Sequence, residues 1–214
     1  MKNPNTILIN MKHFIFTLFA ICSLTVFAQK QDMSKYLAGA VPEKDGMVVF
    51  DKSYDVPNKT KGEIYSLLKK YTEDEIIKGE FSLEQSRIQD ADSIQGVLVA
   101  AVEEYLYFKR TAISTDGTRF YYQLVTQAED GKFTITMRRL RYVYDLTDTP
   151  STEANPDVCF TAEKWITDKE ALNKAQTKLL KIPGKFRRFT IDRKDEIFNG
   201  AAKAVGAERK VKMV

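Results

Sequence analysis

Three pairs of neighbouring carboxylates are the residues of this 214-residue chain that come nearest to catalytic chemistry. They are Asp90 with Asp92, Glu103 with Glu104, and Asp195 with Glu196. Two carboxyl groups held about 5 to 10 Å apart can hydrolyse a glycosidic bond without a histidine, and carboxylates can also hold Ca²⁺. The sequence fixes no such separation, and Asp90-x-Asp92 lacks the rest of a calcium-binding loop. Turn and surface positions are the favoured interpretation, and a carboxylate-dependent hydrolase is the alternative.

Other nucleophilic chemistries depend on the fate of the N-terminus. Residues 1–28 have the pattern of a secretory signal peptide, in which an apolar stretch of about 14 residues ends shortly before Ala28. That stretch is shorter than the roughly 20 residues that a membrane-spanning helix needs. Met11 is the more natural start, so residues 1–10 are interpreted as an upstream extension, and Ile21 before Cys22 disfavours a lipoprotein. We expect cleavage near Ala28 and a periplasmic or secreted product.

Cleavage would remove His13, which is the only histidine, and would leave Cys159 as the single thiol. The remaining 186 residues carry 31 basic and 29 acidic side chains, because Lys2 and Lys12 leave with the leader. This composition excludes base-assisted serine or cysteine catalysis, an intramolecular disulfide, and zinc sites built from cysteine or histidine. We expect no cofactor, no metal and no enzymatic activity, and the near-neutral charge indicates no nucleic-acid partner.

Tyrosine and arginine side chains gather on one predicted face of a sheet. Alternation in strands at 95–109, 119–128 and 133–144 turns one set inward, namely Leu98, Ala100, Val102, Leu106, Phe108, Phe120, Tyr122, Leu124, Phe133, Ile135 and Met137. The outward candidates are Tyr105, Tyr107, Tyr121, Tyr142, Tyr144, Arg119 and Arg138. Tyrosine offers an apolar ring with a polar tip, and arginine offers paired donors. The set predicts a surface for a glycan, a small ligand or an envelope protein; the plainer interpretation is that tyrosine favours strands and that helices cover this face.

A basic run near the C-terminus is a second binding candidate. Its residues Lys178, Lys181, Lys185, Arg187 and Arg188 could contact anionic lipid or another polyanion. The favoured interpretation is a solvated helix face whose cations suit a helix C-terminus. Cys159 is interpreted as a core thiol, and Trp165 as an anchor at the start of a helix.

The elements that position these residues follow from periodicity and turn signals. A strand is predicted at 48–56, and Thr60 with Glu63 forms a capping box that begins a helix. Turns at 115–117 and 129–131 contain Asp-Gly and predict an antiparallel meander.

The division predicted for the chain is a polar lead at 29–46, an α+β core at 47–145, a loop at 146–166 and helices at 167–214. In the last part, Thr167 with Glu170 forms a second capping box, 181–185 breaks the chain, and Asp192 caps a helix that ends at Gly206. The order predicts an α+β fold with an antiparallel sheet and helices on one face.

The segments Val49-Phe50, Val56-Pro57 and 61–65 resemble the opening of domain-of-unknown-function family 4468, which occurs in exported proteins of Gram-negative bacteria. The segment 184–193 also resembles parts of its members, and the resemblance covers about residues 48–128. It implies a TBP-like fold of order β-α-β-β-β-β-α, and it implies no activity and no functional residues. We therefore expect a non-enzymatic exported envelope module that binds through its tyrosine-rich sheet face and has no transmembrane segment. A purely structural role remains open if the chain's own helices bury that face.

Overall fold

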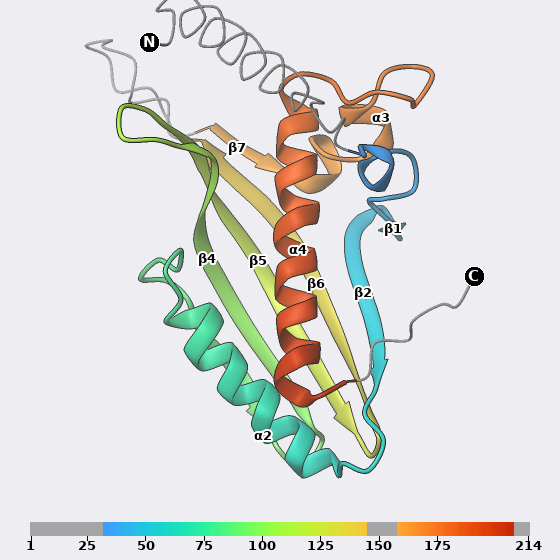
Figure 1. Ribbon diagram of the computed structural model, residues 1–214, viewed down its shortest axis with the longest axis vertical. Coiled ribbons are helices and arrows are strands. Elements are labelled where there is room, and N and C mark those ends of the chain that lie inside the picture. The colour runs from blue at the N-terminus through green and yellow to red at the C-terminus, as the bar shows by residue number, and fades with distance from the viewer. Residues whose placement is uncertain (1–31, 145–157, 208–214) are drawn as a thin grey trace, which may run out of the picture. The chain divides into compact units, whose positions relative to one another are not determined.

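A computed structural model describes residues 32–144 and 158–207 (Figure 1). The chain divides into two units after Met33, and the account below concerns the unit that begins at Ser34. In its described residues, seven antiparallel strands form a sheet of order β1-β2-β6-β5-β4-β3, with β7 paired to β6. The strands are β1 (Glu43–Lys44), β2 (Met47–Asp55), β3 (Arg87–Asp92), β4 (Val97–Arg110), β5 (Thr115–Glu129), β6 (Lys132–Tyr144) and β7 (Val158–Thr161).

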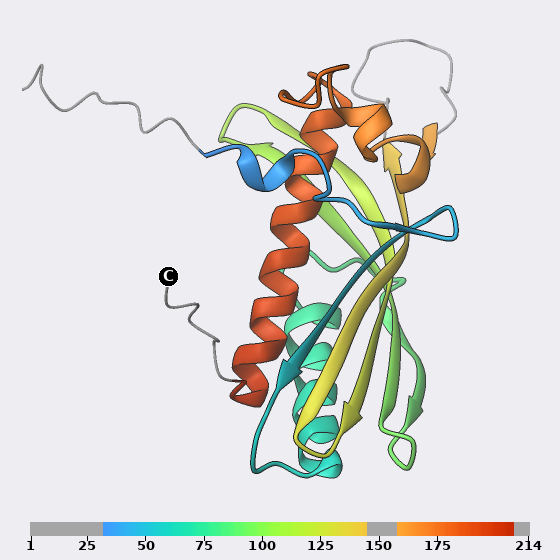
Figure 2. The same ribbon diagram turned by 90° about the vertical axis from the view of Figure 1, so that its right-hand side faces the viewer.

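Two long helices, α2 (Lys61–Tyr71) and α4 (Pro183–Val205), lie on the same face of this sheet (Figures 1 and 2). The shorter elements are η1 (Ser34–Tyr36), the π-helical turn η2 (Thr72–Ile77), η3 (Ala162–Lys164) and α3 (Asp168–Ala171). The α+β class and the helices on one face are thus confirmed. The predicted inward residues of β4, β5 and β6 are buried against these helices, except that Phe108 is half-buried beside Phe186 and Phe189.

Helix α2 begins as its sequence predicts. The backbone N–H of Thr60 donates to Glu63 Oε2 at 2.8 Å, and the backbone N–H of Glu63 donates to Thr60 Oγ1 at 3.3 Å. This capping box satisfies two donors that a helix start otherwise leaves unpaired. At the other end of the helix, Tyr71 Oη donates to the carbonyl of Ile197 on α4 at 3.0 Å. The absence of a side chain at Gly200 leaves room for the Tyr71 ring, so α2 and α4 pack closely.

The turn predicted at 115–117 is wrong. The chain reverses at 111–114, where Thr111 and Ser114 bond to each other, and Gly117 lies inside β5 opposite Tyr107. An added Cβ at Gly117 would lie 2.5 Å from the Tyr105 ring. The glycine is therefore needed because an aromatic ring covers it, not because the chain turns there. The turn predicted at 129–131 is present, with Gly131 at φ +75°.

The C-terminal part differs from its prediction in three ways. Within 146–166, predicted as a loop, residues 158–161 form β7 and residues 162–164 form η3, while 145–157 lie outside the described residues. Thr167 precedes α3 but makes no side-chain cap, and α3 has only four residues. The predicted break at 181–185 contains the start of α4, because Pro183 occupies the first helical position, where its missing N–H is harmless. Asp192 consequently lies inside α4, which ends at Gly206 as predicted.

The basic run does not form one exposed face. Arg187 is completely buried, and its guanidinium donates to the carbonyls of Tyr36, Leu37 and Ile166 and to Asp168 Oδ1, at 2.6 to 2.9 Å. Lys185 pairs with Asp116 at 2.7 Å, and the Arg188 guanidinium lies over the Phe189 ring. Lys178 and Lys181 are exposed, but they lie in irregular chain before α4. One arginine of the run therefore joins η1, η3, α3 and α4 instead of meeting a polyanion.

Arg187→Met is expected to lower the free energy of unfolding by about 3 kcal/mol, because it leaves three carbonyls and one carboxylate without their donor. Urea unfolding at neutral pH measures the change. Arg188→Met is the matched control and is expected to change the free energy by about 1 kcal/mol or less. Equal losses for the two variants would contradict the central position of Arg187.

Candidate functional site

The face of the sheet that points away from α2 and α4 is the first candidate, and it is called the outer face below (Figure 2). One part of this face consists of three successive sets of residues that pair across β4, β5 and β6, and each set is called a row below. Arg119 lies between Tyr105 and Val143, Tyr121 lies between Glu103 and Arg141, and Gln123 lies between Ala101 and Arg138. Within the described ranges, α2 and α4 lie on the opposite side of the sheet, and in these rows Arg119, Arg138 and Arg141 are exposed whereas Glu103 is buried.

Five of the seven predicted residues lie on this face. The arginines Arg119 and Arg138 are exposed, and the tyrosines Tyr105, Tyr107 and Tyr121 are half-buried. Tyr105 and Tyr107 form an aromatic pair with ring centroids 4.6 Å apart, and Tyr107 also contacts Phe81 beyond the edge of β4. These two rings therefore pack at the border of the sheet, while Tyr121 lies among the arginines.

Tyr142 was predicted to face outward, and this prediction is wrong. Its side chain is buried, stacks on Phe120 at 5.2 Å and shares a 2.7 Å hydrogen bond with Thr190 of α4. The cause is one extra residue in β6: Arg139 adopts φ +57°, and the register with β5 shifts beside it. Such a bulge reverses the alternation of all residues beyond it. The side chain of Tyr144 lies outside the part of the chain that the structure describes.

The same bulge turns Arg141 outward, and Arg141 was not among the predicted site residues. Its guanidinium carbon lies 4.1 Å from the centroid of the Tyr121 ring. Tyr121 Oη donates to Glu103 Oε1 at 2.7 Å. Partial burial raises the pKa of Tyr121, and the hydrogen bond to Glu103 raises it further, so the hydroxyl remains a neutral donor. The sequence signal for Arg141 was the break that Arg139 and Arg141 make in the strand's alternation.

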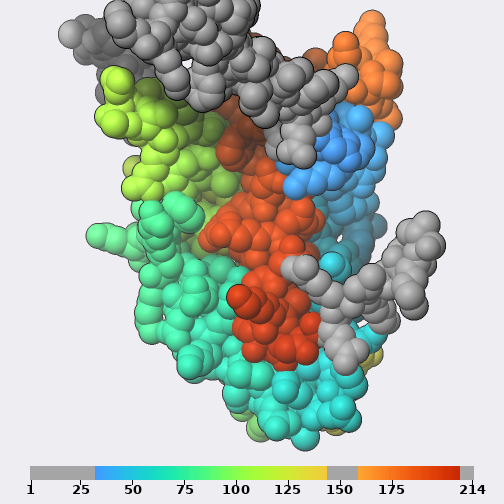
Figure 3. All heavy atoms as spheres, viewed as in Figure 1, coloured from blue at the N-terminus to red at the C-terminus, as the bar shows by residue number. Residues whose placement is uncertain are grey.

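A small cavity between α4 and the part of β4 that bonds to Phe81 and Leu83 is the second candidate, and the side of the molecule with α4 in front is shown in Figure 3. It has a volume of about 180 Å³ and is lined by Phe81, Glu104, Tyr105, Leu106, Tyr107, Phe189, Asp192, Arg193 and Glu196. The predicted pair Glu103 and Glu104 is split between this cavity and the outer face, because successive strand residues point in opposite directions. The cavity nevertheless brings three carboxylates together, as the hydrolase alternative requires.

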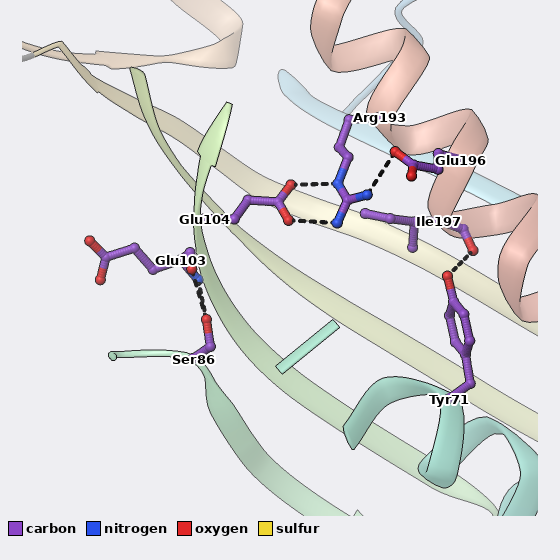
Figure 4. Close-up of polar contacts among 7 residues, drawn as sticks. All are labelled: Tyr71, Ser86, Glu103, Glu104, Arg193, Glu196 and Ile197. Carbon is purple, nitrogen blue, oxygen red and sulfur yellow. Dashed lines mark hydrogen bonds and ion pairs between the residues drawn. The ribbon is translucent and has the colours of Figure 1, made fainter. Parts of the chain in front are cut away.

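Each of those carboxylates is already engaged, and Figure 4 shows the contacts of Glu104 and Glu196. Both oxygens of Glu104 accept from Arg193 at 2.9 Å, and Arg193 also donates to Glu196 at 2.7 Å. Burial lowers the pKa of Arg193, but the hydrogen bonds and charge of Glu104 outweigh it and raise the pKa, so the guanidinium stays charged. Asp192 accepts from Lys35 and Tyr36. This arrangement ties α4 to the sheet and leaves neither oxygen of Glu104 free to protonate a leaving group.

The other acidic residues have turn and surface positions. Asp92 Oδ1 accepts from the backbone N–H groups of Ile94 and Gln95, and Asp195 pairs with Lys194. Among residues 32–144 and 158–207, no group of three or more histidine, cysteine or carboxylate side chains is arranged to hold a metal ion. Within the same ranges, no helix has the length and apolar character to cross a membrane.

Cys159 and Trp165 complete the predicted positions. Cys159 lies on β7 opposite Val143 and is exposed, so its prediction as a core thiol is wrong. Trp165 stacks on Phe160 at 4.2 Å and meets the edge of Phe186. It thus anchors η3 against the start of α4.

The sheet order, with both long helices on one face, places the chain in the class of TBP-like α+β folds. A TBP-like protein from Parabacteroides distasonis ATCC 8503 shares this fold, with a TM-score of 0.61 and 21% identity over 78% of this chain and 99% of that chain.

Residues 50–143 match the family described as "Domain of unknown function (DUF4468) with TBP-like fold". The crystal structure of a DUF4468 family protein from Bacteroides ovatus ATCC 8483 is 35% identical, with a TM-score of 0.72 over 85% of this chain and 99% of that chain. The chain belongs to the DUF4468 family, as the segments at 49–50, 56–57 and 61–65 predicted. No curated protein matches it.

The burial of Tyr142 gives the fold a measurable dependence on pH. Burial raises the pKa of Tyr142, although its hydrogen bond with Thr190 opposes the shift. In the unfolded chain the phenol ionises near its ordinary pKa of about 10. Its contribution to stability is therefore complete below that pH and is lost as pH rises above it toward the folded pKa.

Between about pH 9 and pH 11, the free energy of unfolding is expected to fall more for the native chain than for Tyr142→Phe, which cannot ionise at this position. Urea unfolding at a series of pH values measures both slopes. Identical slopes would mean that Tyr142 titrates as an exposed tyrosine, as simple alternation of β6 predicts.

Proposed function

We propose that this chain is an exported, non-enzymatic binding module of the bacterial envelope, and that the outer face is its binding surface. The observation that carries this proposal is the one-sided packing of the sheet. Both α2 and α4 cover the inner face, whereas the described part of the chain leaves Arg119, Arg138 and Arg141 exposed around Tyr121 on the other. Exposed arginine beside tyrosine is a composition enriched at binding surfaces.

A carboxylate-dependent hydrolase is the weaker candidate. The cavity beside β4 favours it, because Glu104, Asp192 and Glu196 all contribute to the lining. The contacts of Glu104 argue against it, since a retaining or inverting glycosidase needs one carboxyl group free to donate a proton. Both Glu104 oxygens instead accept from Arg193.

A purely structural role is also disfavoured. It would require the outer face to be buried by the chain's own helices, and every long helix of the described ranges packs on the opposite side (Figure 2). The basic run is not part of the proposed surface, because Arg187 is buried and Lys185 is paired with Asp116.

Export rests on the sequence pattern of residues 1–28, which lie outside the described residues. Protein recovered from the envelope or medium of cells that express the full chain is expected to begin at Gln29, because Val26 and Ala28 suit a signal peptidase. N-terminal sequencing measures this. Leu18→Arg, which interrupts the apolar stretch, should keep the protein uncleaved inside the cell. Recovered, folded protein that retains His13 would contradict export by cleavage.

The binding surface is tested with the exported protein immobilised and exposed to envelope extract. Tyr121→Ala combined with Arg141→Ala is expected to abolish retention of material that the native protein holds, because these residues stand at the centre of the outer face. Lys203→Ala, an exposed change on α4, is the control and should retain that material. Lys203→Ala should melt within a few degrees of the native protein, since surface changes are usually within about 0.5 kcal/mol. The double variant leaves the buried Glu103 carboxylate without its donor, so retention is compared at a temperature at which melting shows this variant to be folded. Equal retention by all three proteins would refute the proposed surface.

A further inference from the structure

The arginines of the outer face form a row. Arg119 on β5, Arg141 on β6 and Arg138 on β6 belong to three consecutive rows of the β5–β6 pair. Alternate residues of β5 are separated by about 7 Å, so the three rows that contain these arginines follow one another at roughly that interval, with Arg119 one strand to the side of the other two. We call Arg119, Arg141 and Arg138 the arginine row.

The arginine row is a run of exposed positive charge. Within the described residues, Arg138 and Arg141 form no ion pair with a carboxylate, and neither does the exposed neighbour Arg139. Glu103 is the one acidic residue in the three cross-strand rows; it is 6% exposed and accepts from Tyr121. The next row along the sheet contains Asp51, which pairs with Lys44, and Asp90. The arginines therefore present an electropositive strip that these two carboxylates border at the Arg138 end.

Arg138 and Arg141 are held in place by neighbours that leave guanidinium N–H groups available to a ligand. Arg138 donates through Nε to Gln123 Oε1 at 2.8 Å, and Gln123 in turn donates to Gln89 at 2.9 Å. The two terminal nitrogens of Arg138 have no partner within the described residues. Arg141 is stacked on the Tyr121 ring, which fixes the plane of its guanidinium. Such pre-organised forks suit the paired oxygens of a carboxylate or sulfate group.

We propose that the arginine row binds a linear acidic polysaccharide whose carboxylate or sulfate groups contact successive arginines. The proposal rests on the proposed function and names the ligand class of the same face. Charge complementarity supplies the main argument, and the amides of Gln89 and Gln123 beside the row offer donors and acceptors to sugar hydroxyls. Single-stranded nucleic acid fits less well, because it requires aromatic rings free to stack on bases, and the Tyr121 ring is covered by Arg141.

The test measures binding of the exported protein to heparin and to polygalacturonate by calorimetry, in about 100 mM salt so that unspecific long-range attraction is screened. Arg138→Gln combined with Arg141→Gln is expected to weaken binding at least about tenfold, since it removes two charge-assisted contacts to the acidic groups. Lys178→Gln combined with Lys181→Gln removes the same charge from exposed positions elsewhere. This control is expected to stay within about twofold of the native protein, because it leaves the row intact.

Three outcomes would overturn the proposal: no binding to either polysaccharide, equal weakening by both double variants, or tighter binding to an oligothymidylate of matched charge. The proposed function fails separately. If Tyr121→Ala with Arg141→Ala abolishes retention from envelope extract while neither polysaccharide binds, the outer face is a binding surface for another ligand class. If the polysaccharides bind and Arg138→Gln with Arg141→Gln weakens their binding, the result supports an acidic polysaccharide as the ligand.

Discussion

The buried ion pair between Glu104 and Arg193 is the interaction on which the arrangement of the domain depends. Glu104 projects from β4 into the helix-covered side of the sheet with a side chain that is 1% exposed. Charges removed from water are tolerated only with a well-placed partner, so displacement of α4 along the sheet would strand both groups. Arg187 adds a second constraint near the start of the same helix. These two contacts hold α4 on one side of β5 and β6, and no long helix of the described residues lies on the other side.

Much of the fold could be predicted because short-range signals agree with the final structure. The alternation in β4 and β5 gives the correct inner residues, and the capping box at Thr60 gives the correct helix start. The failures have long-range causes. Gly117 resembles a turn residue, but its role is to admit the Tyr105 ring from the neighbouring strand. Arg187 resembles a surface cation, and only the folded chain shows the carbonyls that surround it.

The candidate site could be predicted only in outline. The sequence indicates that tyrosine and arginine share one face of the sheet, and Arg119, Tyr121 and Arg138 lie there. It does not indicate the left-handed backbone at Arg139, because arginine has no special preference for positive φ. That one conformation exchanges Tyr142 for Arg141 on the outer face. The resulting surface is more cationic and less aromatic than the amino-acid pattern suggested.

The bulge at Arg139 also means that β6 tolerates substitutions on one side but not the deletion of a residue. Side chains on its open side can vary in type, because few neighbours pack against them. The number of residues cannot vary in the same way, since deletion of a single position would rotate Leu140 and Tyr142 out of the interior and force Arg141 into it. Relatives that keep this surface should therefore differ in the composition of the strand far more freely than in its length.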